Sequence, residues 1–387
     1  MPFTPNRRSF IIASGMTALA STRVLGANDT LRVGIIGAGG RMRTLLDCAE
    51  KTNANYQIVA VSDVYGPRRD EVKTRSNGIA TTHLDYHEVL AKDIDVVMIA
   101  SNDHWHVRMA CDALAAGKDV YLEKPVTHTI EEGATLAHAV HSSKQVLQCG
   151  MQQRSWTHFR SAVDLIQGGS LGRVTQVRTY WWQNYNQTGW KPKPIDTEAL
   201  DWKMWLGGAP DQPFSIEKFY RWRWFWNFGG GGMTDLFTHW IDVAQWMLDD
   251  PHPKNATALG GIYQLLDQRQ NPDTVSAIVQ YDGWNLNFES SVLSIRNDHP
   301  SVFFEGTEGT LDLSRDGYTY TPNQGTPSEV SSTESLERAH TRNFLDAIVS
   351  GAQINAPLKA GIEASLPIQM ALKSYWSHKR VSQSQLA

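Results

Sequence analysis

The first 150 residues alternate between two patterns of apolar positions. Short apolar runs are typical of strands buried on both faces, whereas apolar residues spaced three or four positions apart are typical of helices. Runs of the first kind predict strands at Leu31–Ile36, Tyr56–Ser62, Ile94–Ala100, Val120–Leu122 and Val146–Gly150. Helices are predicted between them, one that follows the segment 37–42 and ends at about Glu50, and others at 86–92, 107–116 and 129–143. Strands that alternate with helices form parallel units, so this half is predicted to be an α/β domain.

The second half starts with the same patterns and then becomes rich in strands. A helix at 155–168, a strand at 172–183 and a helix at 233–247 come first. Further strands are predicted at 257–263, 274–281, 284–291, 302–306, 309–313 and 317–321. Asp-Gly pairs at 282–283 and 316–317 are typical of hairpin turns, so this sheet is predicted to be antiparallel. The polar segment 323–333 is predicted to be a mobile loop, and helices at 334–349 and 361–377 close the domain.

The amino end has a different composition. Residues 1–28 contain no acidic residue, and Asn6-Arg7-Arg8-Ser9-Phe10-Ile11-Ile12 leads into an apolar run ending near Ala20. This pattern resembles a twin-arginine export signal, with Ala18-Leu19-Ala20 or Leu25-Gly26-Ala27 as the cleavage site; the alternative is a frayed helix. We therefore expect a signal peptide at 1–28, a dinucleotide-binding domain at 29–150 and a substrate-binding and oligomerisation domain at 151–387. Such a protein would be exported, for example to the periplasm.

Composition and charge limit the classes of partner that the protein is expected to bind. The chain has 387 residues, 41% of them hydrophobic and 20% charged, with a net charge of -4. The absence of a long basic run argues against nucleic-acid binding and against a polybasic membrane patch. No apolar run after the signal approaches the roughly 18 residues of a membrane span, so no stable membrane insertion is expected once the signal is removed. Cys48, Cys111 and Cys149 have no metal-type spacing and are expected to be buried thiols.

A glycine-rich segment follows the first predicted strand directly. Gly37, Gly39 and Gly40 allow a tight turn and a close approach of the backbone to a diphosphate, and Arg41 and Met42 open the next helix. Met42 stands where the dinucleotide-binding motif has its third glycine. All five residues are predicted to contribute to the cofactor site.

The acid at the end of the second strand favours NAD. Asp63 lies 63 − 40 = 23 positions after Gly40, close to the spacing of about 20 for a ribose-binding acid. A carboxylate there would repel a 2′-phosphate. Arg68 and Arg69 are close enough in sequence to keep NADP as the alternative cofactor.

Polar residues also follow the later strands of this half. Because the carboxyl ends of parallel strands line one crevice, these residues are predicted to contact the cofactor. They are Ser101, Asn102, His104, Trp105, His106, Glu123, Lys124 and Gln152. Two histidines two positions apart could also form a metal pair, but no third ligand lies near them in the sequence, so no metal site is predicted.

The run Gly229–Gly232 precedes a helix whose polar face carries Asp235 and His239. Residues four positions apart lie on one face of a helix, so the two side chains are expected to point together. The alternative is an ordinary solvated face, with Asp235 favoured by the helix dipole.

Tryptophan is concentrated between Trp181 and Trp246, a stretch that holds ten of the fourteen tryptophans. Aromatic rings can stack on sugar faces, although most of these rings are expected to serve packing. The predicted substrate-binding residues are Lys124, Arg154, Trp182, Arg223, Asp235 and His239.

These motifs together resemble the Gfo/Idh/MocA oxidoreductases. The resemblance depends on the loop 34–42, Asp103-His104-Trp105-His106, Glu123-Lys124-Pro125, and the Gly229–Gly232 run with Asp235 and His239. It implies an N-terminal Rossmann domain and a C-terminal α/β domain with a largely antiparallel open sheet that often pairs subunits, hence a homo-oligomer. It also implies catalytic roles for Lys124, Asp235 and His239. Secreted members similar to glucose-fructose oxidoreductase, and the NAD-dependent glycosidases, belong to the same superfamily.

The chemistry that follows is oxidation of a carbinol. His239 is expected to accept the hydroxyl proton, Lys124 to stabilise the developing alkoxide, and Asp235 to orient the imidazole or a neighbouring hydroxyl.

An exported enzyme has little free NAD around it, so the cofactor is expected to stay bound and to pass through a closed redox cycle. The function predicted first is oxidoreduction of a sugar or glycoside hydroxyl. The alternatives are a glycosidase that works by transient oxidation, elimination and water addition, and a carbohydrate-binding protein that keeps a nucleotide without catalysis.

Overall fold

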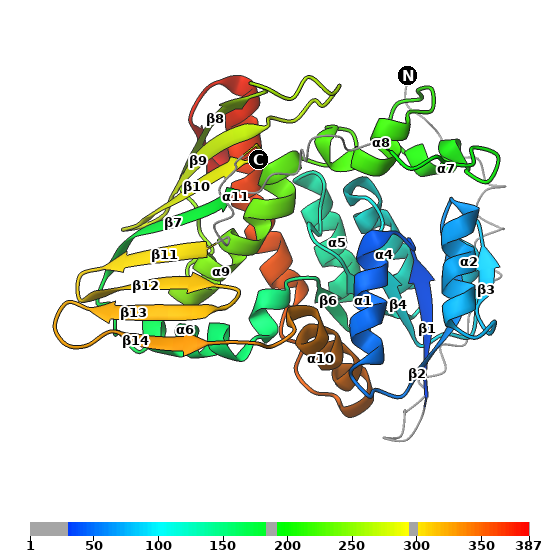
Figure 1. The fold of residues 1–387 in the computed structure, drawn as a ribbon, viewed down its shortest axis with the longest axis horizontal. Coiled ribbons are helices and arrows are strands. Elements are labelled where there is room, and N and C mark those ends of the chain that lie inside the picture. The colour runs from blue at the N-terminus through cyan, green and yellow to red at the C-terminus, as the bar shows by residue number, and fades with distance from the viewer. Residues whose placement is uncertain (1–29, 183–191, 294–300, 387) are drawn as a thin grey trace.

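The computed structural model describes residues 30–182, 192–293 and 301–386. The predicted signal peptide at 1–28 and the end of the predicted strand at Gln183 lie outside the described residues. Two sheets organise the rest, one of six strands and one of nine (Figure 1). Within the described residues, no helix combines the length and the apolar character needed to cross a membrane.

The first sheet is parallel throughout, with the strand order β3-β2-β1-β4-β5-β6. Its strands are β1 (Leu31–Ile36), β2 (Tyr56–Ser62), β3 (Thr81–His83), β4 (Val96–Ile99), β5 (Asp119–Leu122) and β6 (Leu147–Cys149). Its helices are α1 (Gly40–Glu50), α2 (Gly66–Arg75), α3 (Tyr86–Leu90), α4 (His106–Ala115) and α5 (Glu131–Ser142). The predicted Rossmann-type sheet is confirmed. The strand order reverses between β1 and β4, which is where such sheets bind ligands.

The second sheet is antiparallel except where β10 runs parallel to β7, and its order is β14-β13-β12-β11-β7-β10-β9-β8-β15. Its strands are β7 (Val174–Trp182), β8 (Asn255–Gly261), β9 (Thr274–Gln280), β10 (Asn285–Ser291), β11 (Ser301–Gly306), β12 (Gly309–Ser314), β13 (Gly317–Pro322), β14 (Ser328–Ser331) and β15 (Val381–Ser382). The prediction of a loop across 323–333 is wrong in part, because β14 pairs with β13 there. An exposed edge strand has no apolar face to bury, so its sequence does not distinguish it from a loop.

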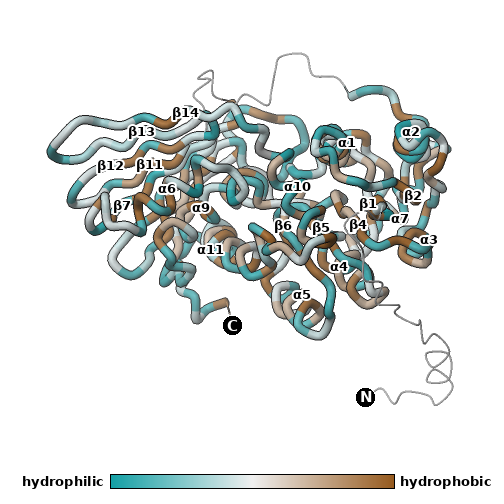
Figure 2. Tube along the Cα trace, turned by 90° about the horizontal axis from the view of Figure 1, so that it is seen from below, coloured by the Kyte–Doolittle hydropathy of each residue, from teal (hydrophilic) through white to brown (hydrophobic). Residues whose placement is uncertain are grey.

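Helices cover one face of the second sheet and leave the other open (Figure 2). The covering helices are α6 (Thr157–Gln167), α9 (Thr238–Leu248) and α11 (Leu358–Ser377). Strand β9 alternates strictly between buried and exposed residues, as a sheet with one open face requires. Under the helices, Phe237 stacks on Phe288 with ring centroids 4.2 Å apart, and Trp240 is fully buried.

The helix predicted at 233–247 begins with a π-helical turn, Met233–Phe237, which continues into α9. The Thr238 hydroxyl donates to the carbonyl of Thr234, and the amide of Gly230 donates to the Thr234 hydroxyl. The turn is therefore fixed to the glycine run that precedes it. Turns of this kind are frequent at functional sites.

Between β7 and this turn the chain leaves the second sheet and packs against the first domain (Figure 1). This excursion, residues 192–228, contains α7 (Trp202–Leu206) and α8 (Ile216–Arg221). The amide of Gly66 donates to the carbonyl of Ala199 at 2.9 Å, and the amide of Asp201 donates to that of Val64 at 3.0 Å. Helix α10 (Leu336–Ser350) packs against α1 and makes a second connection between the domains.

The loop between β8 and β9 is held by a buried carboxylate. Asp273 accepts hydrogen bonds from the amides of Tyr263, Gln264 and Leu265 at 2.9 to 3.0 Å. Burial alone would raise the pKa of Asp273, but the three amide donors lower it below the usual range. The same loop supports the glycine run, because the Asn271 side chain donates to the carbonyl of Gly229.

Asp273→Asn is expected to lower the free energy of unfolding at neutral pH by about 2 kcal/mol, because a neutral amide oxygen replaces the charged acceptor of three hydrogen bonds. A carboxylate whose folded pKa is lowered stabilises the protein above its unfolded pKa of about 3.9, and this contribution is lost as pH falls through the folded value. The difference between variant and wild type should therefore shrink in acid. Urea unfolding at pH about 7 and about 3 measures it. The exposed Asp282→Asn is the control, and equal effects of the two variants would contradict the prediction.

Candidate active site

A cavity of about 560 Å³ lies where the two domains meet. The ends of β2, β4 and β5, the glycine loop, the excursion and the π-helical turn all contribute to its walls. Most of the predicted site residues line it, namely Gly37, Gly39, Gly40, Arg41, Asp63, Ser101, Asn102, Trp105, Glu123, Lys124, Gln152, Arg223, Asp235 and His239. Predictions made from separate motifs thus meet in one place.

One end of the cavity fits a dinucleotide. Gly37 has a φ of +79°, and a Cβ there would lie 2.9 Å from the amide nitrogen of Ser101. A Cβ on Gly40 would meet nothing within 4 Å, and no side chain caps α1, which leaves the amides of its first turn for a diphosphate. The Asp63 carboxylate is held at the end of β2 by the amides of Ala38 and Tyr65, at 2.8 and 2.9 Å. It is placed to receive ribose hydroxyls.

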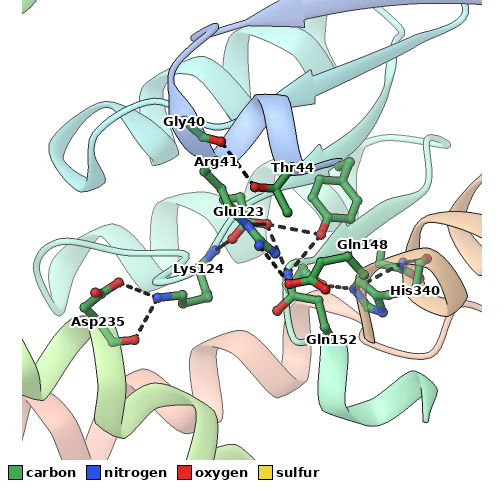
Figure 3. A network of polar contacts seen from close by, with 12 residues as sticks. Gly40, Arg41, Thr44, Glu123, Lys124, Gln148, Gln152, Asp235 and His340 are labelled. Atoms are coloured by element: carbon green, nitrogen blue, oxygen red, sulfur yellow. Dashed lines mark hydrogen bonds and ion pairs between the residues drawn. The ribbon is translucent and has the colours of Figure 1, made fainter. Parts of the chain in front are cut away.

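Glu123 connects several elements beneath this end (Figure 3). Its carboxylate accepts from the Arg41 guanidinium at 2.9 Å, from the Gln152 amide at 3.1 Å and from the Tyr121 hydroxyl at 3.2 Å. Arg41 also pairs with Glu337 of α10 at 3.1 Å. The arginine of the glycine loop is therefore held by two carboxylates, and Glu123 fixes the backbone from which Lys124 extends.

Lys124 crosses to the second domain and meets Asp235 (Figure 3). Its Nζ donates to the Asp235 carboxylate at 2.6 Å and to the Asp235 carbonyl at 2.7 Å. Nε of Arg223 lies 3.1 Å from the same carboxylate. Burial would raise the pKa of Asp235, but Arg223 and Lys124 lower it below its usual range. Asp235 is therefore an anion that holds the Lys124 side chain in place.

His239 lies in the same cavity and is almost completely buried. Burial and the charge of Lys124 lower its pKa well below the usual value, so the imidazole is neutral near pH 7. Among the described residues, none forms a hydrogen bond with Nδ1 of His239. The hydrogen bonds and ion pairs found there for the Asp235 carboxylate go to Lys124 and Arg223, so the structure does not support its predicted orientation of the imidazole.

Two predicted histidines and Met42 face away from the cavity. Met42 packs in the core between α1 and the first sheet, so it serves packing. The ring of His104 packs against Phe228 and Trp205 of the excursion, with centroids 5.2 and 6.2 Å away, and burial lowers its pKa to about 3. Nδ1 of His106 lies 2.6 Å from the carbonyl oxygen of Pro125, and this buried ring holds two loops together. The prediction that Met42, His104 and His106 contact the cofactor is therefore corrected: all three have a packing or positioning role.

Two predicted substrate residues are also placed elsewhere. The Arg154 guanidinium donates to both oxygens of Asp242 at 2.8 to 3.0 Å, so it belongs to a buried ion pair. Alternation along β7 directs Trp181 into the cavity and Trp182 to the open face, where it stacks on Tyr180 at 4.5 Å. The prediction that Trp182 lines the substrate site is therefore corrected, because its neighbour Trp181 lines the cavity instead.

The structure adds cavity residues that were not among the predicted site residues. They are Asp103 beside Asn102, Arg68 of α2, Trp205 and Tyr220 of the excursion, Trp222, and Arg315 from the turn after β12. Arg315 places its guanidinium 5.0 Å from the ring of Trp181. Asp103 had a signal in the sequence, since it follows β4 at the carboxyl edge of the sheet, and Arg68 had one, since it lies close to Asp63. Within the described ranges, no three histidine, cysteine, aspartate or glutamate side chains form a group that could hold a metal ion.

The chain is similar to known proteins over most of its length. Residues 31–151 match the model of an oxidoreductase family with an NAD-binding Rossmann fold, and residues 159–312 match the GFO/IDH/MocA C-terminal domain. Inositol 2-dehydrogenase of Rhizobium meliloti (strain 1021) is 24% identical over 91% of this chain and 99% of its own. Rhizopine catabolism protein MocA of Rhizobium meliloti is 30% identical over 48% of this chain and 60% of its own.

Solved structures have the same fold. Levoglucosan dehydrogenase in complex with NADH gives a TM-score of 0.74 at 19% identity, over 92% of this chain and 99% of its own. The WlbA dehydrogenase from Bordetella pertussis, in complex with NADH and UDP-GlcNAcA, gives a TM-score of 0.71 at 17% identity. The match covers 92% of this chain and 99% of the WlbA chain. Both family models match in order along one chain that carries the glycine loop, Asp63 and Lys124 in one cavity. The protein therefore belongs to the Gfo/Idh/MocA oxidoreductase family and has an NAD-binding Rossmann domain at its amino end.

Proposed function

We propose that the protein oxidises a hydroxyl group of a sugar or glycoside to a carbonyl group and reduces a carbonyl group in the return step. The observation that carries this proposal is the arrangement of Lys124, held by Asp235, and neutral His239 in one cavity with the dinucleotide end. NAD, when bound, supplies the acceptor for a hydride. A protein base must still take the hydroxyl proton, because the cofactor has none to offer.

The protein's own groups divide this work. The neutral imidazole of His239 can accept the hydroxyl proton. The Lys124 ammonium stabilises negative charge that develops on the substrate oxygen, and the buried setting strengthens that effect. Asp235 acts through Lys124, because its carboxylate holds the ammonium in place. The pair is preorganised, since both partners are bonded before a substrate arrives.

The walls of the substrate end suit a carbohydrate. Trp181, Tyr220 and Trp222 supply aromatic faces for the C–H surfaces of a sugar, and Arg223 supplies donors for hydroxyl groups. The names of the similar proteins, inositol 2-dehydrogenase and levoglucosan dehydrogenase, support a polyhydroxylated substrate.

We propose further that NAD stays bound through the cycle. The excursion covers the nucleotide end of the cavity: Trp205 and Tyr220 line it, and Phe219 places its ring 4.5 Å from the Arg68 guanidinium. The Trp105 indole donates to the carbonyl of Trp205 at 3.2 Å, which closes this cover onto the loop after β4. A covered cofactor suits export by the twin-arginine route, which the Arg7-Arg8 pair supports, because little free NAD is found outside the cytoplasm.

The open face of the second sheet is proposed to pair subunits. Leu259 and Ile278 are 67% and 50% exposed there, and Tyr180 and Trp182 stack on the same face. An exposed apolar surface on a sheet is typical of an interaction site. A homo-oligomer would cover it.

Lys124→Ala and His239→Ala are each expected to lower turnover about 100- to 10,000-fold, because each removes a group that acts in the transition state. The measurement is the rate of bound NAD reduction on mixing with sugar. The exposed Lys254→Ala and His141→Ala serve as matched controls and should keep wild-type rates. Full turnover by either active-site variant would disprove the roles assigned here.

The freshly purified protein is expected to carry about one NAD(H) per chain. Its absorbance near 340 nm should change on addition of a sugar that is a substrate and return with a second, carbonyl-bearing sugar. Release of the aglycone from aryl glycosides would instead indicate glycoside cleavage. Protein that is purified without nucleotide and needs added NAD at every turnover would contradict a resident cofactor.

Ile278→Glu is expected to shift the protein toward the monomer, because it places a charge in the centre of the proposed subunit interface. Light scattering coupled to size exclusion measures the mass. Ser276→Glu, on the same face of β9 but at a polar position, is the control for a general effect of charge. An unchanged mass for both variants would exclude this face as the interface.

A further inference from the structure

Asp103 is the buried acid that the mechanism above does not use. It opens the short 3-10 helix Asp103–Trp105 directly after β4, at the carboxyl edge of the first sheet. Only 3% of the residue is exposed, yet it lines the cavity shared by Lys124, Asp235 and His239. What little surface it retains therefore faces the place where a ligand would lie.

Among the residues that the structure describes, no hydrogen bond to either carboxyl oxygen of Asp103 is found, and the nearby charges of Arg223 and Lys124 are what favour its ionised form. The other buried or partly buried acids around the site differ in this respect. Glu123, Asp235 and Asp242 each accept hydrogen bonds from neighbouring side chains. A buried polar group without a partner is costly, and such groups are uncommon in folded proteins. A ligand oxygen in the cavity would remove that cost.

The glycine run leaves room beside this carboxyl group. A Cβ on Gly229 would lie 3.3 Å from Oδ2 of Asp103 and 3.1 Å from the ring of Trp222. A side chain at 229 would therefore crowd both the carboxyl group and the aromatic wall of the cavity. The lack of one keeps Asp103 accessible from the substrate end.

We propose that Asp103 contacts the carbohydrate directly and donates a hydrogen bond from its carboxyl group to an oxygen of the sugar. This proposal rests on the proposed function, and it makes Asp103 a specificity-determining residue of the same site. An oxygen of the nicotinamide amide could receive the same hydrogen bond, and the experiment below separates the two.

The electrostatic surroundings support a protonated carboxyl group. Burial raises the pKa of Asp103 to about 8, with Asp235 of the π-helical turn and Glu132 of α5 adding to the rise. Arg223 of the excursion and Lys124 at the end of β5 act in the opposite direction. The group is therefore mainly protonated at neutral pH and can donate. Above its pKa it would lose the proton and add a second anion beside Asp235, so sugar binding should weaken as pH rises.

The test compares Asp103→Asn and Asp103→Ala with the exposed control Asp164→Asn. The probes are free hexoses, their methyl glycosides and myo-inositol. Tryptophan fluorescence measures the dissociation constant of each probe on protein that carries NAD, and the absorbance of denatured supernatant measures the cofactor content. The dissociation constants of the probes and the turnover rate are both measured from about pH 6 to about pH 9.

Asp103→Ala is expected to weaken binding of the sugar about 10- to 100-fold, as for a lost hydrogen bond to a buried group, with unchanged NAD content. Asp103→Asn keeps a donor, so it should recover much of the affinity but lose the decline in binding between neutral and alkaline pH. The control should behave as wild type.

Other results would overturn the assignment. Unchanged affinity in both variants with the alkaline decline intact would show that Asp103 does not contact the sugar. Lower NAD content with unchanged sugar affinity would place the contact on the cofactor. If Asp103→Ala fails to fold, the pH dependence of Asp103→Asn decides alone. Binding without turnover in the wild type would refute the proposed function while leaving Asp103 testable, whereas no binding of any probe would refute both.

Discussion

The contact between Lys124 and Asp235 is the constraint on which the site depends. It joins the end of a parallel strand in one domain to a π-helical turn in the other, through two hydrogen bonds from one ammonium group. A largely buried ion pair loses much of the hydration of both charges, so it is retained only where geometry and further partners compensate. Arg223 supplies part of that compensation at the Asp235 carboxylate. The lysine side chain is consequently held in one position inside the cavity.

The surrounding structure keeps this contact in position from both sides. Glu123 fixes the backbone before Lys124 by bonding to Arg41 and Gln152, and it fills the space that a side chain at Gly150 would need. On the other side, the glycine run and the Asp273 loop hold the turn that carries Asp235. Movement of either domain would separate the ammonium from its carboxylate. The cofactor end and the substrate end are thus coupled through a few buried polar groups.

Sequence patterns predicted the structure correctly wherever the residues that determine it lie close together along the chain. The glycine loop, the spacing to Asp63 and the alternation of strands and helices are local properties, and they predicted the Rossmann domain and its ligand edge correctly. The helical spacing of Asp235 and His239 likewise placed both in one cavity. The strand patterns and the Asp-Gly turns of the second half were also enough to predict an antiparallel sheet.

Only the tertiary structure decided which side chains reach the cavity. Trp181 and Trp182 are neighbours with the same chemistry, and the register of β7 between β10 and β11 directs one inward and the other to the open face. His104 turns toward aromatic residues about a hundred positions later in the chain, which no local pattern specifies. Asp103 and Arg315 become site residues because separate elements converge on them. The sequence determined which elements form and which edge binds ligand, whereas packing between distant elements determined which residues face that ligand.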